Sequence, residues 1–114
     1  MANLPETTLE TVFNLQKQLF QILNQASATD YCLLEKYGET QETLAEVEEL
    51  QNIKEKARDS YIRLSRLLLT IGEAQPTFSQ NTLDLLYKSI QQTDATIAAL
   101  KASTQEIKKN WKIL

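Results

Sequence analysis

In the last third of the chain, residues suited to a helix core recur every three or four positions without interruption. We call such a row of residues a seam. Its members are apolar except for two threonines: Leu83, Leu86, Ile90, Thr93, Ile97, Leu100, Thr104, Ile107, Trp111 and Leu114. Because an α-helix turns once in about 3.6 residues, this alternation places all these side chains on one face. The seam therefore predicts a helix over residues 79–112 that packs against other helices.

Two earlier segments carry the same alternation. The first seam runs from Val12 to Leu33, and the second runs from Leu44 to Ile71. The 114 residues include only two glycines and two prolines, whereas sheet proteins need these residues at their many turns. We therefore expect further helices over residues 5–37 and 40–71, with short connections that make neighbours antiparallel. The predicted fold is all-α, an up-down-up three-helix bundle that forms a single domain over residues 1–114.

The first predicted helix contains four small or polar residues in a row, Ser27 to Asp30. A break near Ser27 would give four helices, which is the alternative fold. However, Ala26, Thr29 and Leu33 continue the seam in phase, and each polar residue costs a helix interior only a few tenths of a kcal/mol relative to alanine. The pattern favours one continuous helix that ends at Gly38.

Residues suited to capping flank the predicted helices. Side chains that can accept hydrogen bonds from free N–H groups stand at the three starts: Asn3, Thr40 or Thr43, and Ser79. Phe78 and Leu83 can form a hydrophobic staple around the last of these caps. Gly72 follows the second segment, and we expect it to end that helix as a left-handed C-cap.

Charge and composition exclude several classes of function. The net charge of −3 lacks the basic surplus expected of a nucleic-acid-binding domain. The longest strongly apolar run, residues 67–69, is far shorter than the ~20 residues that cross a membrane. The chain has no histidine and no paired cysteines, so we expect no metal, no cofactor and no enzymatic activity. One cysteine cannot form an internal disulfide, which favours a cytoplasmic location.

Cys32, the only cysteine, is the one candidate nucleophile. A reactive thiolate needs a nearby cation or a helix N-terminus, and Cys32 lies near a predicted helix C-terminus between Asp30 and Glu35. We therefore expect a half-buried packing residue beside Leu33.

Two other features of the seams have structural explanations. Trp111 is expected to plug the end of the core near Tyr37, with lysines of residues 101–112 facing the acidic residues 39–49. Thr29 and Thr104 fall at about the same level of the bundle. We interpret them as a tolerated or register-fixing polar layer, and a water pocket or ligand niche is the alternative.

The feature that most favours a partner lies on the first helix. Beside its seam stand Phe13, Phe20 and Leu34, at spacings of seven and fourteen residues. They widen the apolar face to roughly 160°, against roughly 100° for a minimal core stripe. If these side chains lie outside the core, they form a patch suited to another helix. The sequence thus predicts a non-catalytic protein-interaction module that binds a protein partner or itself, as a homodimer through the first helix.

A different class of function uses the second helix. Arg58, Arg63 and Arg66 could hold an anionic compound, in a small-ligand-binding protein or an enzyme. Because Arg63 and Arg66 lie away from the apolar seam, we expect them to be solvated, and this function is the alternative.

Overall fold

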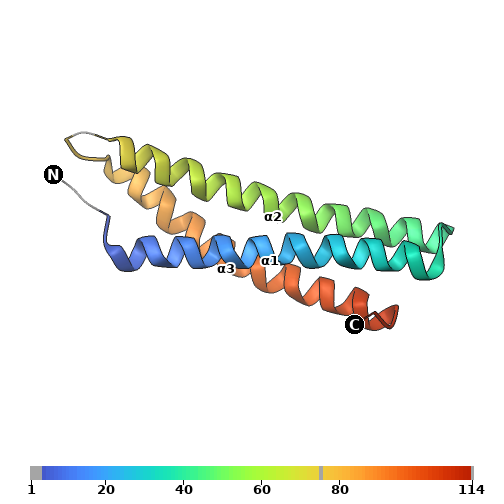
Figure 1. The fold of residues 1–114 in the computed structure, drawn as a ribbon. Coiled ribbons are helices and arrows are strands. Elements are labelled where there is room, and N and C mark those ends of the chain that lie inside the picture. The colour runs from blue at the N-terminus through green and yellow to red at the C-terminus, as the bar shows by residue number, and fades with distance from the viewer. Residues whose placement is uncertain (1–3, 75, 114) are drawn as a thin grey trace.

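The computed structural model describes residues 4–74 and 76–113. It contains three helices in these ranges, α1 (Glu6–Tyr37), α2 (Gln41–Glu73) and α3 (Gln80–Asn110), and each helix contacts both others. The Cα atoms extend over 57 × 19 × 17 Å, so the molecule is a slender rod (Figure 1). The predicted all-α three-helix bundle is confirmed.

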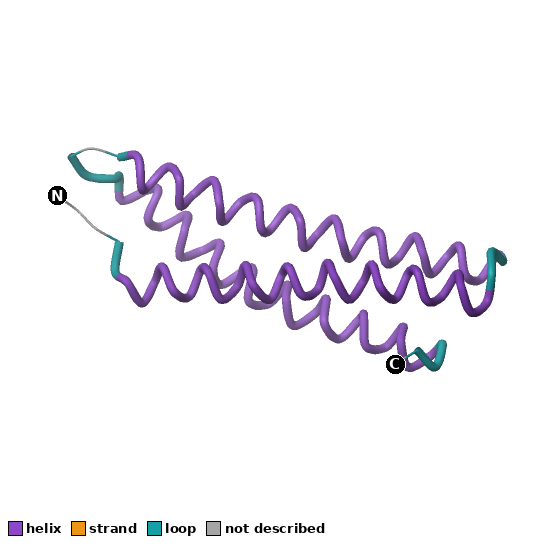
Figure 2. Tube along the Cα trace, in the orientation of Figure 1, coloured by secondary structure: helices purple, strands orange, loops and turns teal. Residues whose placement is uncertain are grey.

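The helices alternate in direction along the rod. α1 and α2 run side by side and are joined by a tight turn at one end, and the loop between α2 and α3 lies at the other end (Figure 2). In the same view α3 crosses behind α1 and ends on the side of the α1–α2 turn. The up-down-up order follows from the short connections.

α1 continues through the segment where a break was the alternative. Ser27 and Ala28 are exposed, so the hydroxyl group of the serine is not enclosed in the core. Thr29 is buried, and its Oγ1 donates a hydrogen bond of 2.7 Å to the carbonyl oxygen of Gln25 in the preceding turn. The polar residues are therefore accommodated without a break, and the four-helix alternative is wrong.

The three seams meet in one core along the rod. Five leucines have no exposed surface: Leu19, Leu33, Leu50, Leu64 and Leu86. Fully burying a side chain of this size contributes about 1.5–3 kcal/mol, so the seams supply the main stabilisation of the fold. Small residues such as Ala26 and Ala57, which are also fully buried, lie between the leucines along the seams.

The helix ends agree with the sequence in part. Thr40, rather than Thr43, caps α2: its hydroxyl accepts from the N–H of Thr43, and the Thr43 hydroxyl accepts from the N–H of Thr40. Ser79 caps α3 by accepting from the N–H of Thr82 at 3.1 Å. The predicted cap of the first helix involves Asn3, which lies outside the described residues.

Two C-terminal ends differ from the prediction by two residues. α2 continues through Gly72 to Glu73 and is capped by Ala74, so Gly72 is helical rather than a left-handed cap. α3 ends at Asn110, where Trp111 forms the C-cap. Gly38 does adopt a positive φ of 73° after α1, and its N–H donates to the carbonyl oxygen of Leu34.

Two leucine-to-alanine variants, one in the core and one on the surface, test the assignment of these residues. Leu19→Ala should lower the free energy of unfolding by about 2–5 kcal/mol, because it opens a cavity in the middle of the core. Leu69→Ala is the matched control, since Leu69 is 63% exposed and its truncation should change stability by less than about 0.5 kcal/mol. Urea unfolding followed by circular dichroism measures both, and equal losses would contradict the assigned core.

Candidate partner-binding face

Four residues of α1 form a row that we name the α1 stripe: Phe13, Phe20, Ser27 and Leu34. Each follows a fully buried seam residue by one position: Val12, Leu19, Ala26 and Leu33. One residue rotates a helix by about 100°, so the stripe runs beside the core rather than into it. The seven-residue spacing keeps the four side chains in line along the helix.

The two phenylalanines of the stripe are exposed to solvent. Phe13 retains 54% and Phe20 retains 62% of its accessible surface, whereas Leu34 is half-buried. α2 and α3 together cover only the seam side of α1. The sequence left open whether these rings belong to the core, and the structure places both outside it.

Tyr31 enlarges the same face and was not singled out from the sequence. It is 69% exposed and lies eleven residues after Phe20. Eleven residues complete very nearly three helical turns, so Tyr31 stands close to the line of the α1 stripe. This eleven-residue spacing was the signal that could have identified it.

The helix around the first three residues of the stripe, Phe13, Phe20 and Ser27, is poor in charge. From Thr11 to Thr29 the only charged residue is Lys17, in a chain in which 24% of residues are charged. The exposed positions between the aromatic residues carry neutral amides and hydroxyls, as at Gln21 and Asn24. Depletion of charge around exposed aromatic residues is typical of the central part of a protein interface.

Exposed apolar side chains also occur on the other helices. The most exposed of them are Leu44 and Leu69 on α2 and Leu85 on α3, each at least half exposed. Leu44 and Leu69 lie 25 positions apart on one helix, and Leu44 is followed by Glu46, Glu48 and Glu49. Leu69 lies seven residues after Ile62, which is 38% exposed, whereas Leu44 stands alone, and single exposed leucines are normal on soluble proteins. The α1 stripe differs because its most exposed side chains are aromatic.

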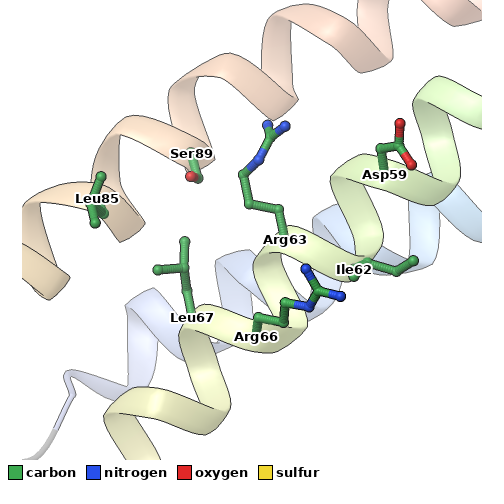
Figure 3. A pocket seen from close by; sticks show the side chains of 7 residues that line it. All are labelled: Asp59, Ile62, Arg63, Arg66, Leu67, Leu85 and Ser89. Carbon is green, nitrogen blue, oxygen red and sulfur yellow. The ribbon is translucent and has the colours of Figure 1, made fainter.

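A groove between α2 and α3 forms a second candidate site, which we name the arginine groove (Figure 3). It has a volume of about 520 Å³ and is lined by Asp59, Ile62, Arg63, Arg66, Leu67, Leu85 and Ser89. The structure thus brings together two of the three arginines singled out from the sequence. Arg58 does not line the groove. Arg63 and Arg66 are exposed, as expected.

Trp111 lies at the end of the bundle, where the sequence placed it. The indole Nε1 donates a hydrogen bond of 2.9 Å to Oε2 of Glu46 on α2. The ring packs edge-on against Tyr37 of α1, with 5.1 Å between ring centroids, and the Tyr37 hydroxyl donates to the Trp111 carbonyl oxygen at 2.6 Å. One residue therefore links the ends of all three helices.

The lysines and acids that we expected to face each other at this end form no direct ion pair in the described part of the chain. Within residues 4–74 and 76–113, the only ion pair joins Lys54 to Asp30 at 3.3 Å. Glu46 accepts from the indole instead. Exposed ion pairs contribute little and fix two long side chains, so opposite charges can share one end of the bundle without direct contact.

The polar layer in the core is satisfied locally. Thr104 donates to the carbonyl oxygen of Leu100 at 2.8 Å, as Thr29 does to Gln25. These bonds within each helix support the interpretation of tolerated threonines. Thr93 is 1% exposed, and its hydroxyl has no hydrogen-bond partner in the described part of the chain.

Cys32 differs from its expected environment. It is exposed rather than half-buried, and it borders a shallow hollow of about 410 Å³ with Tyr31, Lys36 and Ile113 among the lining residues. The seam position beside it, Leu33, is the one that faces the core.

The described part of the chain offers neither a metal site nor a membrane-spanning helix. Among the described residues, no group of three or more His, Cys, Asp or Glu side chains is placed to hold a metal ion. None of the helices in the described ranges combines the length and apolar character needed to cross a bilayer. No protein-family model, curated protein or solved structure matches this chain.

A double-mutant cycle tests the contact at the bundle end. Trp111→Phe keeps an aromatic ring but removes the donor to Glu46, and should cost about 0.5–1.5 kcal/mol of unfolding free energy beyond the loss of ring area. Glu46→Ala removes the acceptor. Thermal or urea unfolding measures the free energy of unfolding of each variant. The double variant should lose less unfolding free energy than the two single variants together, and strictly additive losses would show that the two side chains do not interact.

Proposed function

We propose that this protein is a non-catalytic helical module that self-associates through the α1 stripe. The observation that carries the proposal is the exposure of Phe13 and Phe20, aligned on a helix face that is nearly free of charge. Large aromatic side chains in such surroundings are the residues that contribute most to protein interfaces. A free thiol and the lack of an internal disulfide favour the cytoplasm as its location.

The dimensions of α1 suit a modest dimer interface. Its 32 residues extend over about 48 Å, and a helix with its side chains is about 10–12 Å wide. Two such faces pressed together bury on the order of 1,000 Å² in total, which reaches the lower range of specific protein interfaces. We therefore expect a reversible dimer rather than an obligate one.

A second copy of the chain is favoured as the partner because the stripe is complementary to itself when reversed. In an antiparallel pair, Phe13 of one copy lies opposite Leu34 of the other, and Phe20 lies opposite Ser27. Each ring thus meets a smaller side chain, as in helix packing where ridges fill grooves. The two-fold axis passes between Leu23 and Asn24, and every stripe residue has a stripe partner.

Charge substitution in the stripe tests the proposal. Light scattering on the wild type at high concentration should give twice the 13.0 kDa chain mass. Phe13→Glu/Phe20→Glu should give a monomer, because each interface would then bury four carboxylates. The circular dichroism spectrum should not change, since neither ring contributes to the core.

Leu44→Glu/Leu69→Glu is the matched control for this experiment. It removes two apolar side chains of similar exposure, 50% and 63%, and adds the same charge on α2. This control should remain a dimer. A monomeric wild type at all concentrations, or equal dissociation of both double variants, would contradict self-association through α1.

Single cysteines test the antiparallel orientation. In a Cys32→Ser background, Asn24→Cys should form a disulfide-linked dimer on oxidation, because the two copies of residue 24 flank the two-fold axis. Lys17→Cys should not, since antiparallel copies of residue 17 lie about 20 Å apart along the helix at 1.5 Å per residue. Non-reducing gels measure both. Equal crosslinking at the two positions would indicate a parallel pair instead.

A further inference from the structure

We infer that the arginine groove between α2 and α3 binds an acidic, amphipathic helical segment of a partner protein. The groove combines two guanidinium groups with an apolar floor and wall, and all the described residues that line it belong to α2 or α3. The inference does not rest on self-association, because no residue of the α1 stripe lines the groove.

The positions of the two arginines suit paired carboxylates. Arg63 extends from α2 toward α3 on the side of Ser89, and Arg66 extends along α2 toward Ile62 (Figure 3). They are three residues apart on one helix, so they project from neighbouring positions on its surface. Acidic residues three or four positions apart on a partner helix present carboxylates at a similar interval.

The charges of the groove are left unbalanced by the chain itself. In the described part of the chain, neither guanidinium donates a hydrogen bond or lies within 4 Å of a carboxylate. Asp59 is the one acidic residue that lines the groove. Two positive charges therefore face one negative charge, and an acidic partner restores the balance. Arginine is well suited to this role because its planar fork matches a carboxylate.

The apolar part of the groove favours a partner with a leucine-like side chain. Leu67 points toward Leu85 across the gap between the helices (Figure 3), and Leu85 is 55% exposed. Ser89 is small and only 5% exposed, so it leaves a hollow beside these two leucines. An apolar side chain on the partner would fill that hollow, as in recognition of an amphipathic helix by a groove.

The shape of the groove favours a helical partner over a small anionic compound, which was the alternative ligand considered from the sequence. Small-molecule sites enclose most of the ligand surface. Here Asp59, Ile62, Arg63, Arg66 and Leu85 are all exposed, so the groove is open along one side. An open channel between two helices accommodates a third helix better than it retains a small molecule.

A fluorescent peptide tests the inference. The probe is a short alanine-based helical peptide with two glutamates three residues apart and a leucine one turn further on. Fluorescence anisotropy should detect binding to the wild type that weakens as salt is added. Arg63→Gln/Arg66→Gln should weaken it about tenfold or more, because two charge-assisted hydrogen-bonding partners are lost.

Matched controls isolate the groove from general electrostatics. Lys56→Gln/Arg58→Gln removes the same charge from exposed positions of α2 that do not line the groove, and it should weaken binding less than about twofold. A peptide with glutamine in place of both glutamates should bind far more weakly. The Phe13→Glu/Phe20→Glu variant should bind the acidic peptide as the wild type does, which keeps this test separate from self-association.

Three results would overturn the inference. The first is the absence of peptide binding to the folded wild type. The second is equal weakening by the Arg63/Arg66 and Lys56/Arg58 double variants, which would indicate a diffuse charge effect. The third is binding of inorganic phosphate, measured by calorimetry, without binding of the peptide, which would assign the groove to a small anion.

Discussion

Burial of the three apolar seams is the interaction on which the rest of the structure depends. Each helix is more than 30 residues long, and most of the stability of a helix in a protein comes from packing of its apolar face rather than from its own propensity. Mutual coverage of the seams stabilises the helices and fixes how they are rotated about their axes. That rotation decides which residues face outward, so the exposure of Phe13 and Phe20 follows from the burial of Val12 and Leu19.

The fold was predictable from the sequence because its signal is repeated along the whole chain. The unbroken phase through Ala26, Thr29 and Leu33 correctly predicted one helix across Ser27. Helix ends were less predictable, since they depend on one or two residues. Gly72 resembles a terminator, yet it can also stay helical, and the ladder of hydrogen bonds continues past it to Glu73.

The candidate sites were predictable only in part. Periodicity identified Phe13, Phe20 and Leu34, but it does not say how wide a face two neighbouring helices will cover. The arginine groove required the structure, because Leu85 and Ser89 come from α3 and their level beside Arg63 depends on how the helices align. Arg58 is close in sequence but does not line the groove. The charge pattern at the bundle ends likewise did not predict that the Glu46 carboxylate accepts a hydrogen bond from the Trp111 indole.

The placement of the arginine groove across the bundle from α1 has a consequence for assembly. A two-fold pair built on α1 would carry two such grooves, facing outward in opposite directions. Such a dimer would bind one acidic segment in each groove, on opposite sides, and would thereby link two segments that do not lie on the same flat surface. If the two segments belonged to one larger assembly with matching spacing, the second contact would form at a high effective concentration, and a weak groove would suffice for firm attachment.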